Sequence, residues 1–233
     1  MNRRVFLFSA TAFLIALIAL FPLRLALAMG GLGSFPVTAR AAEGTIWSGR
    51  LRGVALDGIA VGDFQTGLSV RGLLRGKLAF ALDSLGGDGA KALVFGTSGG
   101  LGVEGLTAAL AIPGAFDPLP IDRIELTNVD VNFSDGQCRS ASGQIRVALA
   151  PTLGTVPLGQ QLRGTLRCDG PAVLLPLASQ STMERARLRI VGDGQYMTQL
   201  SIKPENPEDA AKLAIMGFHE TPGGYVFDLS GQL

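Results

Sequence analysis

The stretch IDRIELTNVDVNFSDG, residues 121–136, decides the fold class. Apolar side chains alternate with polar ones along it: Ile124 and Leu126 come first, and Val129, Val131 and Phe133 follow. Alternation with a period of two is typical of a β-strand that is buried on one face. The parity slips between Leu126 and Val129, which would turn the apolar side chains to the other face. We therefore expect a bulge or bend near Thr127 and Asn128.

Similar alternation recurs along most of the chain after residue 45. It predicts strands near residues 46–56, 67–84, 90–97, 101–112, 144–150, 161–170, 184–191, 195–202 and 223–233. The 32 glycines, many of them within these strands, favour a coiled sheet over a flat one. Among residues 45–233, the stretch from Asn206 to Gly217 carries helix signals: an Asn N-cap, a Pro in the first turn and a Gly stop. It predicts a short helix at about Pro207–Met216.

The stretch GLSVRGLLRGKLAFALDS, residues 67–84, is predicted as one of these strands. Its apolar face would carry Leu74, Leu78, Phe80 and Leu82, and its polar face Arg71, Arg75 and Lys77. In the stretch 184–190, Arg185, Arg187 and Arg189 alternate with Ala186, Leu188 and Ile190, which predicts the solvated face of one strand.

The N-terminal segment predicts a membrane helix. Residues Val5–Leu23 carry no charge, and 19 residues in a helix would reach about 28 Å, close to the bilayer core of about 30 Å. Arg3 and Arg4 precede this segment and the first acidic residue is Glu43, which favours a cytoplasmic N-terminus. A cleaved signal peptide is the alternative, because residues 26–28 read Ala-Leu-Ala.

The predicted organisation has four parts: a cytoplasmic tip at 1–4, a transmembrane anchor (alternatively a signal peptide) at 5–29, a linker at 30–44 and a periplasmic β domain at 45–233. The fold class is mainly β, with a single N-terminal transmembrane helix followed by a curved, largely antiparallel meander sheet. This sheet is expected to be partly rolled, with one short helix near the C-terminus.

Charge and residue content exclude several functions. Residues 30–233 carry 17 basic and 19 acidic side chains, a net of −2, so a nucleic-acid partner is not expected. The lone His219 stands in a turn-like context, GFHETPGG, and no GxSxG elbow is present. We therefore predict a protein that is not an enzyme, with no catalytic, cofactor-binding or metal-binding residues and no cofactor.

The only tryptophan lies in the motif EGTIWSG, shortly after the apolar segment. The residues singled out are Gly44, Thr45, Trp47 and Gly49. Trp47 has two interpretations. It could anchor the core where the glycines leave room, or it could lie as an interfacial indole near lipid headgroups.

The two cysteines, Cys138 and Cys168, also have two interpretations. In an oxidising compartment they would form a disulfide that closes a loop of about 30 residues. Otherwise they are two buried free thiols. A metal site is not favoured, because the spacing is not CxxC and His219 is distant in sequence.

The order of these motifs resembles the type II secretion system protein N family. The matching features are a basic tip, an apolar segment with a proline at its end, EGTIWSG, GQCRSASGQI, LRGTLRCDG, VGDGQY and GGYVFDLSGQL. The stretch Gly86–Pro120 matches poorly. The resemblance implies a single-pass inner-membrane protein with a periplasmic β domain, in which Cys138 and Cys168 carry the family's disulfide.

The resemblance implies a non-enzymatic accessory or structural part of the secretion machinery that supports export of folded periplasmic proteins across the outer membrane. The implied partners are the inner membrane and other secretion-system subunits. An alternative from the residues is a periplasmic β-groove that handles lipid or another apolar ligand, because a curved sheet with one apolar face needs a cover.

Overall fold

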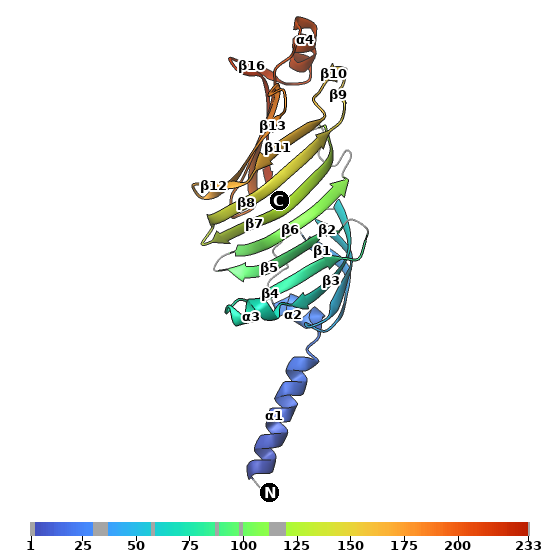
Figure 1. Ribbon diagram of the computed structural model, residues 1–233, viewed down its shortest axis with the longest axis vertical. Coiled ribbons are helices and arrows are strands. Elements are labelled where there is room, and N and C mark those ends of the chain that lie inside the picture. The colour runs from blue at the N-terminus through green and yellow to red at the C-terminus, as the bar shows by residue number, and fades with distance from the viewer. Residues whose placement is uncertain are drawn as a thin grey trace. The chain divides into compact units, whose positions relative to one another are not determined.

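The computed structural model describes residues 3–29, 37–56, 59–86, 89–97, 100–111 and 120–232. The chain forms two compact units, unit 1 at Met1–Gly87 and unit 2 at Asp88–Leu233. Both units are built on antiparallel strands (Figure 1). The mainly β, antiparallel fold with one short C-terminal helix is therefore as predicted.

Unit 1 contains four strands that pair in chain order. Its elements are α1 (Arg3–Ala19), α2 (Leu23–Met29), β1 (Val37–Gly44), β2 (Gly49–Leu56), β3 (Ile59–Leu68), α3 (Val70–Leu74) and β4 (Ala79–Ser84). β1 covers residues 37–44 of the predicted linker at 30–44, and residues 30–36 of that linker lie outside the described residues. The weakly apolar sequence of β1 gives little strand signal alone, and pairing with β2 completes it.

The N-terminal apolar segment forms two helices instead of one. α1 has 17 residues. The break falls at Pro22, which has no backbone N–H to donate and whose ring crowds the preceding turn. No helix in the described part of the chain is both long enough and apolar enough to cross a membrane.

The predicted strand at 67–84 is wrong in its middle. β3 ends at Leu68, α3 follows, and β4 begins only at Ala79. The reason is a local cap: Ser69 Oγ accepts a hydrogen bond from the Gly72 N–H, 3.2 Å away, and starts a helical turn. Capping competes with the strand ladder, so the alternation of leucines and cations does not become a strand face.

Unit 2 continues the meander with longer strands. Its larger elements are β5 (Lys91–Thr97), β6 (Gly100–Ala111), β7 (Ile121–Ser134), β8 (Gln137–Leu149), β11 (Gln161–Thr165), β13 (Ala172–Ser179), β14 (Glu184–Ile190), β15 (Gln195–Ile202), α4 (Pro207–Ile215) and β17 (Gly224–Gln232). The short strands are β9 (Thr152–Leu153), β10 (Val156–Pro157), β12 (Arg167–Asp169) and β16 (His219–Thr221). From β5 the order is β5-β6-β7-β8-β11-β13-β14-β15-β17-β16, with β12 beside β13.

The predicted bulge in the stretch 121–136 is confirmed. The register between β7 and β8 shifts between Thr127 and Asp130. Asn128 adopts a φ of 48°, a left-handed conformation that asparagine tolerates better than most residues. The bulge lets both apolar halves of β7 face the same side of the sheet.

Two apolar clusters hold unit 2 together. The first is formed by buried residues of β7, β8, β11 and β13 with Leu166 between strands: Val129, Cys138, Ile145, Val147, Leu149, Leu162, Leu166, Val173, Leu175 and Leu177. The second is formed where α4 meets the last strands: Val156, Leu200, Ile202, Leu213 and Phe218. α4 matches the predicted helix, and Asn206 caps it by accepting from the Asp209 N–H at 2.8 Å.

Candidate functional site

The motif EGTIWSG forms a tight loop between β1 and β2, at the point where α1 ends. Gly44 has a φ of +87°, and a Cβ there would lie 2.5 Å from the Ser48 carbonyl oxygen. Thr45 N–H donates to that same oxygen at 3.1 Å, and Thr45 pairs with Pro22 in an isolated β-bridge. The loop is therefore bonded both to itself and to the residues that link α1 to α2.

Trp47 bonds to the last turn of α1. Its indole N–H donates to the Ile18 carbonyl at 3.0 Å. In an unbroken helix this carbonyl would accept from residue 22, but that residue is a proline without an N–H. The Phe21 N–H also reaches it, at 3.4 Å. The indole therefore satisfies a carbonyl that the helix break leaves short of a partner.

The core interpretation of Trp47 is wrong. Its side chain is 38% exposed, and the buried residue of this region is Leu23, at 0%. Leu23 is the first residue of α2, and a Cβ on Gly49 would lie 2.5 Å from its Cδ2. Gly49 thus leaves the space that Leu23 occupies, and the close packing joins α2 to the start of β2. We call this arrangement of residues 18–23 with 44–49 the junction.

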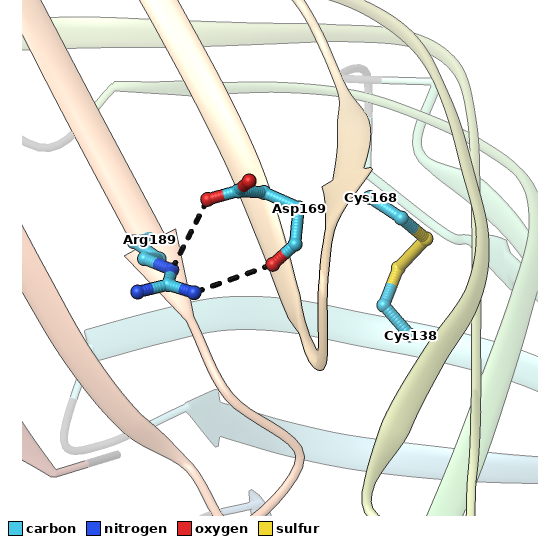
Figure 2. Close-up of a disulfide and its surroundings, with 4 residues drawn as sticks. All are labelled: Cys138, Cys168, Asp169 and Arg189. Atoms are coloured by element: carbon cyan, nitrogen blue, oxygen red, sulfur yellow. Dashed lines mark hydrogen bonds and ion pairs between the residues drawn. A yellow bond between two sulfur atoms is a disulfide. The ribbon is translucent and has the colours of Figure 1, made fainter.

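A disulfide bridges two strands of unit 2. Cys138 of β8 and Cys168 of β12 are bonded, with their Cα atoms 5.7 Å apart (Figure 2). The Cys138 N–H also donates to the Pro171 carbonyl at 3.0 Å. β12 pairs only with β13, so the bridge holds this short strand against β8.

A charged pair lies next to the disulfide. Arg189 of β14 contacts Asp169, with Nε 3.5 Å from the carboxylate and Nη2 donating to the backbone oxygen at 3.3 Å (Figure 2). Both side chains are about half exposed. The pair reaches across β13, from the end of β12 to β14.

A surface cleft of about 620 Å³ lies beside this pair. It is lined by Pro171, Arg189, Val191, Gln195, Tyr196, Met197, Ser230, Gly231 and Gln232. Among the described residues of unit 2, the only exposed large apolar side chains are Met197 and Ile215.

The titratable side chains of the described residues form few contacts with one another. Among the residues that the structure describes, no three His, Cys, Asp or Glu side chains are placed to hold a metal ion. His219 is exposed, with Nε2 3.6 Å from the Asp228 carboxylate. Hydrogen bonds to Glu208 first, and then to Asp209, raise the pKa of Lys212 above its ordinary value of 10.5.

The raised pKa of Lys212 has a structural explanation. The ammonium bonds two carboxylates in the first turn of α4, at 3.1 and 3.2 Å. The stabilisation is fully present below pH 10.5 and is lost as the pH rises through the raised value. It supports a helix and has no bearing on a reaction at neutral pH.

Sequence reasoning found both pieces of the candidate site but missed how the first is assembled. The four motif residues Gly44, Thr45, Trp47 and Gly49 come together in the junction. Their partners Ile18, Pro22 and Leu23 were assigned to the membrane anchor. The signal that could have found them is Pro22, because a proline deprives the carbonyl four residues earlier of its usual donor.

The fold and these sites define a disulfide-bridged antiparallel β protein whose sheet is bonded to an apolar N-terminal helix. The chain belongs to the family described as Type II secretion system (T2SS), protein N, whose model matches residues 36–228. The family resemblance seen in the motifs is thus confirmed, and family membership supports a role in type II secretion.

A curated relative agrees with this assignment. The chain is 27% identical over 212 residues to the "Type II secretion system protein N" of Vibrio cholerae serotype O1 (strain ATCC 39315 / El Tor Inaba N16961). The match covers 82% of this chain and 83% of the relative. No solved structure matches the chain.

Proposed function

We propose that the protein is a non-enzymatic accessory component of the type II secretion machinery, anchored in the inner membrane with its β units in the periplasm. It would support export of folded periplasmic proteins across the outer membrane, in contact with the inner membrane and other secretion subunits. The family match over residues 36–228 carries the proposal, because it includes nearly all of the β structure.

The exposed apolar surface of α1 supports the membrane location. Among its exposed large apolar side chains are Phe6, Leu7, Phe8, Phe13, Leu14, Ile15, Leu17 and Ile18, with Phe8 at 81%. Such a surface is unfavourable in water and favourable in lipid. Leu20 continues it beyond the end of α1, so the apolar stretch is longer than the regular helix.

The disulfide supports the periplasmic location of unit 2. Disulfides persist in the bacterial periplasm, whereas the cytosol keeps thiols reduced. Cys138 and Cys168 lie in unit 2, so the orientation that fits is an N-terminus in the cytoplasm and a C-terminus in the periplasm.

We further propose that the junction transmits the position of the anchor to the sheet. A linker of flexible residues would let the sheet tumble freely above the membrane. Here Trp47, Thr45 and Gly49 contact the chain on both sides of the helix break. The orientation of β1 and β2 relative to α1 would then be fixed.

Deletion and complementation test the function. Cells that lack this protein should retain folded cargo in the periplasm, while passage across the inner membrane stays normal. The full-length chain should restore export. Unchanged export in the deletion strain would contradict the proposal.

The mass of the intact protein extracted from membranes tests the anchor separately. A mass that includes residues 1–28 supports a retained anchor. A mass that begins near Met29 would mean a cleaved signal peptide and would contradict anchoring by α1.

A further inference from the structure

The segment from Ser69 to Leu78 exposes apolar side chains in unit 1. It contains α3 and the turn that leads to β4. Val70, Leu73, Leu74 and Leu78 are exposed, and Leu74 reaches 84%. Singly exposed apolar residues are ordinary, but four within nine positions form a patch that calls for a partner.

Basic side chains accompany this patch. Arg71, Arg75 and Lys77 are all exposed, and no acidic residue occurs between Asp63 and Asp83. Neither Arg71 nor Arg75 takes part in any of the ion pairs found among the described residues. The segment therefore presents an apolar and strongly cationic surface, which we call the α3 patch.

The α3 patch is held by bonds to the junction. The Leu68 N–H donates to the Ile46 carbonyl at 2.7 Å, immediately before the Ser69 cap. A Cβ on Gly67 would lie 2.5 Å from the Trp47 carbonyl oxygen, so these two backbones are in close contact. Figure 1 shows α3 at the end of unit 1 from which α1 leaves.

We propose that the α3 patch is a second membrane contact that binds the surface of a bilayer containing anionic phospholipids. Leu74 and its apolar neighbours would enter the boundary between headgroups and acyl chains. Arg71 and Arg75 would bind the lipid phosphates. The inference rests on the proposed anchoring of α1, which would bring the junction and the patch to the headgroup level.

Two observations favour lipid over a protein partner. The exposed apolar side chains and the arginines lie within a few residues of one another, so one small surface offers both an apolar contact for acyl chains and cations for phosphates. The patch is also continuous in bonding with the point where α1 ends. An acidic protein surface would satisfy the arginines but would leave Val70, Leu74 and Leu78 facing charges.

Site-specific photo-crosslinking tests the proposal. We would introduce p-benzoylphenylalanine separately at Phe8, Leu74 and Ile215 in the full-length chain. Ile215 is a matched control, because it is 86% exposed and lies on α4 of unit 2. Each variant is placed in nanodiscs of phosphatidylethanolamine with or without phosphatidylglycerol, irradiated, and examined by mass spectrometry for covalent lipid adducts.

We expect lipid adducts at positions 8 and 74 but not at 215. Phosphatidylglycerol should raise the yield at position 74 alone. The double change Arg71→Glu and Arg75→Glu should lower that yield by about tenfold, since each basic residue near an anionic surface adds to binding. As a control, the double change Arg185→Glu and Arg187→Glu, at two exposed arginines of β14, should leave the yield of lipid adducts at position 74 unchanged.

The outcomes separate this inference from the proposed function. Adducts at position 8 without adducts at 74 would overturn the α3 contact and leave the anchor intact. No adduct at either position would overturn the anchor and this inference together. Equal yields at 74 and 215, or a crosslink from 74 to a second copy of the chain, would also overturn the lipid contact.

Discussion

Unit 1 and unit 2 are both built on antiparallel strands, but their apolar side chains are distributed in opposite ways. Of the buried apolar residues in the described chain, four lie in unit 1 and twenty-one in unit 2. Of the exposed large apolar residues in the same ranges, sixteen lie in unit 1 and only two in unit 2. Unit 2 therefore has a core of its own, whereas unit 1 presents its apolar surface outward.

The stability of the two units therefore depends on different surroundings. Unit 2 is stabilised by two apolar clusters and a disulfide, all within its own residues. Unit 1 has instead the junction, in which a fully buried Leu23 packs on the first two strands. A sheet with so little buried apolar surface is expected to open more readily than unit 2.

The largest expected effect is removal of the disulfide. Replacing both Cys138 and Cys168 with alanine should lower the free energy of unfolding of unit 2 by about 3–4 kcal/mol, because a loop of this length then stays open in the unfolded chain. Denaturant unfolding of the purified full-length protein measures this loss, and hydrogen exchange shows which unit it affects. Exchange should rise in unit 2 and stay unchanged in unit 1.

The wild-type protein under reducing conditions is the control for this change and should behave like the double variant. An equal rise of hydrogen exchange in both units would show that they unfold together, and the contrast between them would fail.

The next effect concerns Gly49. An alanine there would place its Cβ 2.5 Å from Leu23 Cδ2 and 3.0 Å from the Glu43 carbonyl oxygen. Such overpacking should destabilise the junction by about 1–3 kcal/mol. Gly96→Ala in β5 is the matched control, because a Cβ there meets nothing within 4 Å. Hydrogen exchange should rise in α2 for the first variant only, and a similar response from both would refute the packing role.

Trp47→Phe tests the bond to the end of α1. The variant keeps an aromatic ring but loses the N–H that donates to the Ile18 carbonyl at 3.0 Å. We expect a loss of about 0.5–1.5 kcal/mol, seen as faster exchange over residues 18–23. The control is Tyr196→Phe, which removes the hydroxyl group of an aromatic residue in unit 2 and should leave hydrogen exchange over residues 18–23 unchanged. If hydrogen exchange over residues 18–23 is as slow in Trp47→Phe as in the wild-type protein, the indole has no such role.

The smallest effect is expected at the charged pair beside the disulfide. Arg189 and Asp169 are about half exposed, so Arg189→Gln should reduce stability by no more than about 1 kcal/mol, and by less in high salt. Thermal unfolding at two salt concentrations measures this, with Arg187→Gln on the same strand as the control. A loss as large as that from removing the disulfide would mean that the pair holds β12 in place.

The alternation of residues predicted many strands of unit 2 but missed β13, whose nearly continuous apolar sequence AVLLPLAS does not alternate. Period-two patterns and the capped stretch Pro207–Met216 are local signals, and local backbone preferences carry them into the structure. The bulge near Asn128 could also be predicted, because a regular strand with this slip in parity would turn half of its apolar side chains to the opposite face.

The pattern from Gly67 to Ser84 was misleading for a physical reason. Leucines and cations alternate there as in a strand, but Ser69 caps a helical turn, and β3 stops at Leu68. The register between β3 and β4 ends at Leu68 opposite Phe80, so the sheet offers the residues after Ser69 no ladder partner in place of the cap. A single sequence does not contain that information.

The sequence alone was enough for the family, the antiparallel β class and the helix near the C-terminus, because motif order and short-range periodicity lie along the chain. Only the tertiary structure placed Trp47 on the Ile18 carbonyl and Leu23 beneath Gly49. These contacts join residues about 26 to 29 positions apart, and such pairing depends on how β1 and β2 fold back toward the helix break, which no local pattern encodes.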